Sequence, residues 1–143
     1  MKRKILFSVL IAAVCLAVLF CGLWLQERQN HFNFEQLCRY SAMRSHSRFC
    51  DYRDEGSAYD YHYGVSEFVS FYNSYMSLIT ADSGQTDVNC IYLNQLIGRL
   101  MYFPELTDDQ VGQLVAITAM LSEDIYDENA YNQMFSLFNS MGI

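Results

Sequence analysis

The chain is poor in residues that interrupt helices. Its 143 residues include a single proline, Pro104, and seven glycines, and neither residue type occurs between Leu23 and Glu55. Proline and glycine are the strongest local breakers of a helix, so their scarcity favours long uninterrupted helices. No segment shows the convincing alternation of a β-strand, and the sequence therefore predicts an all-α fold.

Positive charge is also scarce, because no lysine occurs after Lys4. From Gln26 onward the chain carries six arginines against all 16 acidic residues, a formal charge of −10. Phosphate backbones and anionic lipid headgroups would repel such a domain. We therefore expect no nucleic-acid partner.

Compact motifs for catalysis or cofactor binding are missing as well. The sequence has no Gly-rich phosphate loop, no serine elbow and no closely spaced cysteine pair. His46 and Cys50 lie four residues apart, with Cys38 and His62 flanking them. These residue types occur in zinc sites and in nucleophile–base pairs, but the spacing is not that of a strong zinc motif. The sequence predicts no enzyme activity, no metal site and no cofactor.

The one long hydrophobic run covers residues 5–25, which carry no charge. As a helix rising 1.5 Å per residue, the run would span about 32 Å, close to the ~30 Å hydrocarbon core of a bilayer. The basic residues Lys2, Arg3 and Lys4 predict a cytoplasmic N-terminus, and Trp24 suits the far interface. We expect a single-pass plasma-membrane protein that contacts the bilayer through residues 5–25.

The alternative is a cleaved signal peptide and a secreted protein. Cleavage requires small residues one and three positions before the cut. Gly22 would fill the first position, but Phe20 would then occupy the second. An uncleaved anchor is the favoured interpretation.

After the anchor, the pattern predicts a stalk helix and then a loop. The helix is expected to continue to about Phe49, and the Asp-, Gly- and Ser-containing stretch 51–64 is expected to be the loop. The resulting division is a basic start at 1–4, an anchor at 5–25, a juxtamembrane helix and loop at 26–63, and an acidic helical domain at 64–143. The modest apolar face expected on the juxtamembrane helix consists of Phe34, Leu37, Tyr40 and Met43.

Four further helices are predicted in the acidic domain, forming two αα-hairpins of a small bundle. Pro104 is expected to close the second of them. Thr107 and Gln110 have the spacing of a capping box for the third, and Asp127 is expected to cap the fourth. The acidic residues near these starts are interpreted as favourable charges at helix N-termini, because they lack the ligand pattern of a calcium loop.

Three cysteines lie outside the hydrophobic run. On one continuous helix, Cys38 and Cys50 would be about 18 Å apart, too far for a disulfide. Either Cys90 pairs with one of them, or all three remain free thiols.

Tyr59, Tyr61 and Tyr63 are the most unusual local feature of the sequence. On an extended backbone the three rings would lie on one side and offer a contact for a partner chain, because tyrosine is common at interfaces. The alternative is that the rings complete the core. We predict a non-enzymatic accessory or interaction module with a protein partner. A sensor or small-ligand-binding domain is the alternative, and it would require a cavity between the hairpins.

Overall fold

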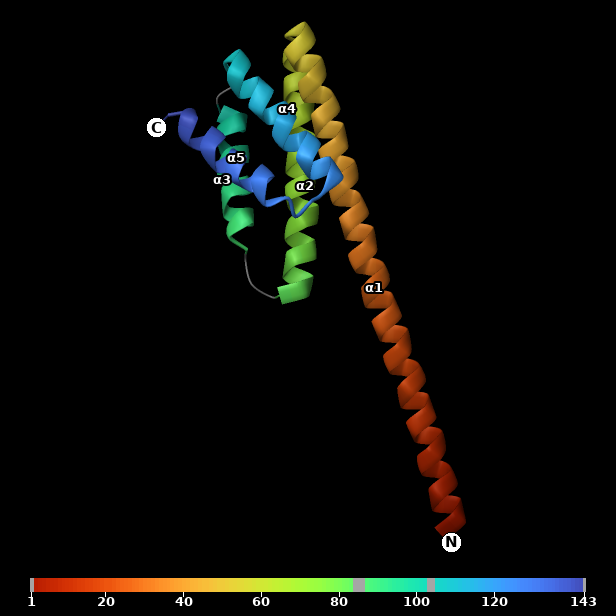
Figure 1. Cartoon of the computed structure of the whole chain (residues 1–143). Coiled ribbons are helices and arrows are strands. Elements are labelled where there is room, and N and C mark those ends of the chain that lie inside the picture. The colour runs from red at the N-terminus through yellow and green to blue at the C-terminus, as the bar shows by residue number, and fades with distance from the viewer. Residues whose placement is uncertain (1, 84–86, 103–104, 143) are drawn as a thin grey trace. The chain divides into compact units, whose positions relative to one another are not determined.

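The computed structural model describes residues 2–83, 87–102 and 105–142, with side chains described from residue 10 onward except 81–83. The described chain forms five helices and contains no strand (Figure 1), so the predicted all-α fold is confirmed. Two units, residues 1–33 and residues 34–143, are considered separately below. The helices are α1 (Lys2–Glu55), α2 (Ala58–Ser83), α3 (Val88–Tyr102), α4 (Asp108–Glu123) and α5 (Glu128–Ser140).

The first unit consists of the N-terminal part of α1. Every side chain from residue 10 to residue 30 is exposed, although most of those up to residue 25 are apolar. By length and composition, α1 contains a segment able to cross a membrane, and none of that segment is buried. Just beyond it, the Arg28 guanidinium lies 5.6 Å from the centroid of the Trp24 ring.

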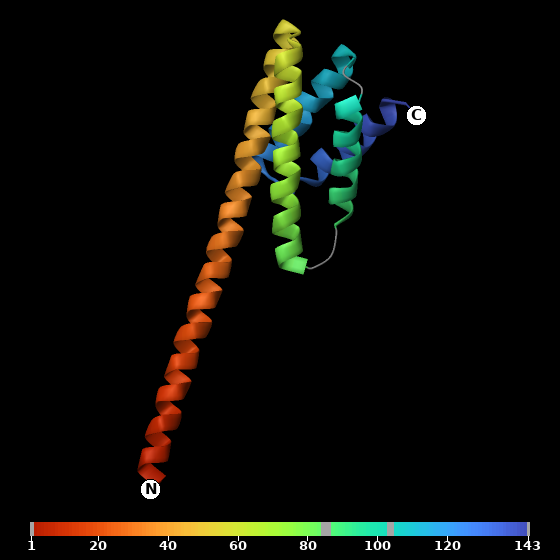
Figure 2. The ribbon, with the colours of Figure 1, turned by 180° about the vertical axis from the view of Figure 1, so that it is seen from behind.

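The second unit is a helical bundle with its own core. α2 packs against α3, and α5 packs against both α3 and α4. Residues 34–55 of α1 run beside α2 in both ribbon views (Figures 1 and 2). Along α2, the rings of Phe68, Phe71 and Tyr75 stack in sequence, with centroids 6.0 and 5.8 Å apart. All three are at most 1% exposed.

The predicted loop at 51–64 is wrong, because most of it is helical. α1 continues to Glu55 and α2 begins at Ala58, so only two residues separate the helices. Gly56 makes this turn possible with a φ of +69°, a conformation that favours glycine. The polar residues before Gly56 lie on the solvent side of α1. Such polar residues are also typical of loops, which explains the wrong prediction.

The apolar face predicted for the juxtamembrane helix is mostly wrong, because only Phe34 of its four residues packs against the core. Leu37, Tyr40 and Met43 are about half exposed. The face that is buried instead carries mainly small side chains, which allow α1 and α2 to approach closely. Its fully buried members are Cys38, Ala42, Ser45 and Phe49.

Gly64 marks the closest approach between α1 and α2. A Cβ atom at this position would lie 2.9 Å from Cε1 of Phe49 and 3.3 Å from Cβ of Arg48. The hydroxyl of buried Ser45 donates to the Gly64 carbonyl at 2.8 Å. The absence of a side chain at Gly64 and the short side chain of Ser45 therefore allow α1 and α2 to lie close together.

The helix starts predicted from local signals are confirmed. Thr107 and Gln110 form both hydrogen bonds of a capping box at α4. The Asp127 carboxylate accepts from the backbone N–H groups of Asn129 and Ala130 at the start of α5. Pro104, the expected end of the second hairpin helix, lies outside the described residues. All five cysteines are free thiols, with Cys38 and Cys90 in the core.

Candidate functional site

Tyr59 and Tyr63 lie together on the surface of α2, whereas Tyr61 does not. On a helix, residues four apart share a face, so the expected common side for all three rings is wrong. The rings of Tyr59 and Tyr63 stack with centroids 5.9 Å apart. Tyr59 is 67% exposed and Tyr61 is 2% exposed.

Tyr61 is a core residue. Its hydroxyl donates to the Leu100 carbonyl at 2.5 Å and thereby links α2 to α3. Its ring contacts Tyr52 and Phe49 of α1, with centroids 5.1 and 6.3 Å away. Burial raises the pKa of the Tyr61 hydroxyl well above its usual value. The suggestion that the rings complete the core therefore holds for this tyrosine.

Two arginines of α1 lie against the exposed tyrosine pair. The guanidinium of Arg48 is 4.8 Å from the Tyr63 ring centroid, and that of Arg44 is 5.4 Å from it. Arg44 also donates to the Tyr63 hydroxyl and lies 5.5 Å from the ring centroid of Tyr40. We call this set, which consists of Tyr40, Arg44, Arg48, Tyr59 and Tyr63, the tyrosine–arginine surface.

Carboxylates hold both arginines in place. Arg48 pairs with Asp60 at 2.9 Å, and Arg44 pairs with Glu67 at 3.0 Å. Asp60 is only 8% exposed, so its charge requires this partner. The pairs fix the guanidinium planes while leaving each arginine side chain more than one-third exposed.

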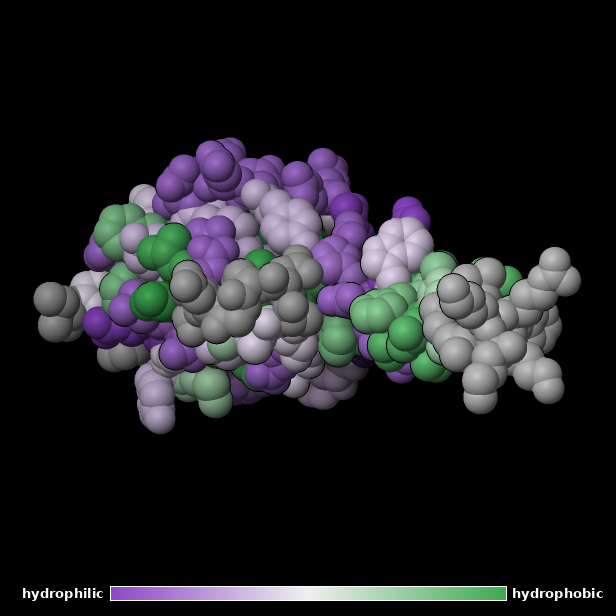
Figure 3. Space-filling model, turned by 90° about the horizontal axis from the view of Figure 1, so that it is seen from below, coloured by the Kyte–Doolittle hydropathy of each residue, from purple (hydrophilic) through white to green (hydrophobic). Residues whose placement is uncertain are grey.

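Two residues of the tyrosine–arginine surface, Tyr40 and Tyr59, are exposed, and the other three are half-buried. Tyr40 and the adjoining Met43 are each 52% exposed. On the larger part of the face in Figure 3, hydrophilic side chains predominate, with hydrophobic side chains scattered among them. Aromatic rings and guanidiniums held in fixed orientations are the groups that most often anchor protein interfaces.

His46 and Cys50 are brought together, but Cys38 and His62 are not part of their contact. The Cys50 sulfur lies 3.7 Å from Nε2 of His46. Cys38 is fully buried, and His62 lies on α2 beside Val65. No group of three or more histidine, cysteine or acidic side chains suited to a metal occurs among the described residues. Burial raises the pKa of the Cys50 thiol.

A groove that the sequence did not reveal lies between α2 and the end of α3. Its volume is about 330 Å³, near the lower limit for small-ligand sites. Four of its lining residues lie within two turns of α2, but the fifth comes from α3, so no pattern within one helix could have indicated the groove. The lining residues are His62, Val65, Ser66, Val69 and Met101.

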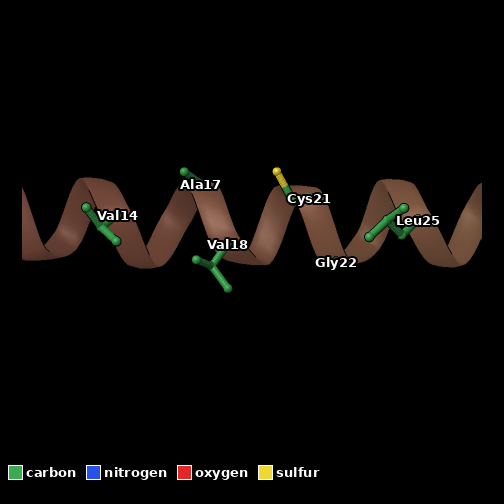
Figure 4. A pocket seen from close by; sticks show the side chains of 6 residues that line it. All are labelled: Val14, Ala17, Val18, Cys21, Gly22 and Leu25. Carbon is green, nitrogen blue, oxygen red and sulfur yellow. The ribbon is translucent and has the colours of Figure 1, made fainter.

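A second depression lies on the apolar segment of the first unit (Figure 4). Ala17 and Cys21 point to the same side of the helix, and Gly22 adds no side chain. Apolar atoms form almost all of the lining, which also includes Val14, Val18 and Leu25. A surface of this kind accommodates lipid chains or another helix and offers no polar group for specific recognition.

Comparison with known proteins does not indicate a function for these residues. No protein-family model matches the chain, and no curated protein or solved structure matches it. The functional argument therefore rests on the residues described above.

Proposed function

We propose that the chain is a membrane-anchored, non-enzymatic interaction module. Residues 5–25 anchor it in the plasma membrane with the N-terminus in the cytoplasm, and the helical domain binds a protein partner outside. The apolar, unburied segment of α1 supports the anchor, and the basic residues before it support the orientation.

The tyrosine–arginine surface is the proposed partner contact, and the exposure of Tyr59, whose ring stacks on that of Tyr63, carries the proposal. A ring that served only to fill the core would be buried, as Tyr61 is. The exposed ring of Tyr59 instead offers apolar area and a hydroxyl, with side-chain freedom already reduced by the stack. A partner that covers it would gain contact area at a low cost in conformational entropy.

Photo-crosslinking in intact cells tests this contact. A photoreactive phenylalanine derivative replaces Tyr59 in the full-length chain, and the adducts are purified from detergent-solubilised membranes and identified by mass spectrometry. We expect one dominant protein adduct, because a specific interface places the same partner over this position in every complex.

Tyr102 provides the matched control position. It is also a tyrosine of the helical domain and is 82% exposed, but it lies at the end of α3. The same derivative at Tyr102 should give no adduct with that partner. The proposal is wrong if the Tyr59 position yields only unreacted monomer, or if both positions yield the same mixture of proteins.

A small-ligand-binding domain is the second candidate, and the groove beside His62 favours it. A ligand seated there would stabilise the folded state and raise the melting temperature. A thermal-shift screen of small molecules therefore separates the two candidates. A hit that disappears in the Met101→Ala variant would favour ligand binding in this groove, because Met101 lines it while remaining 63% exposed.

A further inference from the structure

His46 is oriented by a residue from a different helix. Its Nδ1 lies 3.0 Å from the carbonyl oxygen of Val115 in α4. A carbonyl oxygen only accepts, so Nδ1 carries the proton in this contact, and Nε2 is left with its lone pair. Nε2 lies 3.7 Å from the sulfur of Cys50, which is one helical turn further along α1.

The distance between these two atoms suits a shared zinc ion. Zinc lies about 2.3 Å from a cysteine sulfur and about 2.0–2.1 Å from a histidine nitrogen, usually in tetrahedral geometry. Two ligands with these bond lengths are about 3.6 Å apart. The Cys50 sulfur and His46 Nε2 are 3.7 Å apart. The separation of the two donor atoms is therefore the one that a shared zinc ion requires.

The Val115 carbonyl supplies the support that a zinc-bound histidine requires. Metal-binding histidines almost always donate their other ring N–H to a carbonyl or carboxylate, which fixes the ring and its tautomer. His46 already makes this bond across the α1–α4 contact. Free rotation of the ring is consequently restricted before any metal arrives.

We propose that His46 and Cys50 form a two-ligand site for a borderline-soft divalent cation such as Zn²⁺. Both side chains are half-buried, so the two donors are shielded from bulk solvent but not sealed in the core. Binding replaces the thiol proton, which passes to solvent, and the metal joins the resulting thiolate to Nε2. Water or a donor from another molecule fills the remaining tetrahedral positions. This site is independent of the tyrosine–arginine surface.

Cobalt substitution tests the site on the full-length chain in detergent, after reduction and desalting. Co²⁺ takes the coordination of zinc, and its bond to a thiolate gives a strong near-ultraviolet charge-transfer band. We expect this band to saturate at one Co²⁺ per chain and to disappear when Zn²⁺ is added. The Cys50→Ser variant should lose the band, because it keeps the size of the side chain but removes the soft donor.

His46→Gln should weaken Co²⁺ binding at least about tenfold, because a fixed nitrogen ligand is lost. His62→Gln, which changes a histidine outside the site, should leave the titration unchanged. Far-ultraviolet circular dichroism confirms that each variant remains folded. Absence of the band in the wild type, or undiminished affinity in His46→Gln, would show that Cys50 and His46 make only a thiol–imidazole hydrogen bond.

Discussion

The two parts of α1 belong to one helix but have opposite relations between polarity and exposure. From residue 10 to residue 25 the side chains are largely apolar and all are exposed. Between residues 38 and 49, the buried positions include alanine and two serines, while Leu37, Tyr40 and Met43 remain about half exposed. Helical secondary structure alone therefore does not indicate which side chains are buried and which are exposed.

The proposed membrane anchor accounts for this difference. A segment surrounded by hydrocarbon needs apolar side chains on every face, with no preference for size. A segment packed against another helix needs small side chains where the backbones approach, as Ser45 and Gly64 provide. Its outer face is then free to carry tyrosine and methionine.

The largest expected effect concerns the apolar part. Leu16→Arg combined with Leu19→Arg places two charges near the centre of the anchor, and insertion should become less favourable by about 6 kcal/mol. We expect the protein to leave the carbonate-resistant membrane fraction. Leu37→Arg with Met43→Arg, at exposed positions of the packed part, should leave fractionation unchanged. Intact-mass measurement of the membrane-extracted wild type completes the test, because loss of the apolar segment would indicate a cleaved signal peptide.

A smaller effect is expected where α1 meets α2. Gly64→Ala would place a methyl group 2.9 Å from the ring of Phe49, which is fully buried and has little room to move. We expect the free energy of unfolding to fall by about 1–3 kcal/mol, as in other overpacked cores. Urea unfolding followed by circular dichroism measures the change.

Gly98→Ala is the matched control for this substitution. A Cβ at Gly98, within α3, would meet no atom within 4 Å. The added methyl should therefore stabilise the helix by about 0.4–1 kcal/mol, because alanine has less conformational freedom in the unfolded chain. Equal effects at Gly64 and Gly98 would contradict a close contact between α1 and α2.

The last expected effect, absent at neutral pH, is a pH dependence from Cys38. Burial, with a contribution from Glu35, raises the pKa of this thiol from 9.0 to about 12. Above pH 9 the unfolded chain therefore releases a proton that the folded chain retains, and stability falls as pH rises. The loss approaches 1.4 kcal/mol per pH unit between the two pKa values.

Comparison of the wild type with Cys38→Ala isolates this contribution, because the buried tyrosines remain in both proteins. Urea unfolding under reducing conditions at pH 8 and pH 10 should show a smaller decrease for the variant. Parallel decreases would mean that Cys38 is solvated in the folded protein.

The fold was largely predictable because its signals are local. The capping box of Thr107 and Gln110 and the cap by Asp127 each depend on residues within one helical turn. One prediction that failed was the loop at 51–64, where a polar, tyrosine-rich sequence forms the end of one helix and the start of the next. Polarity indicates contact with water, but an exposed helical face meets water as well as a loop does.

The candidate site was only partly predictable. The tyrosines were visible in the sequence, but their spacing was interpreted on an extended backbone instead of a helix. Buried Tyr61 was therefore grouped with Tyr59 and Tyr63, which lie on the surface of α2. The i, i+4 spacing also indicated that His46 and Cys50 could meet on a helix. The arginines on the neighbouring helix and the paired carboxylates that orient them had no local signature.

By itself, the sequence determined the helical class, the apolar segment and the helix caps, because each depends on composition or on neighbours within a few residues. Only the tertiary structure decided which side of each helix is buried, and with it the roles of individual residues. The Val115 carbonyl that orients His46 lies 69 residues away along the chain. Such contacts depend on how helices pack against one another, and no pattern within a single helix contains that information.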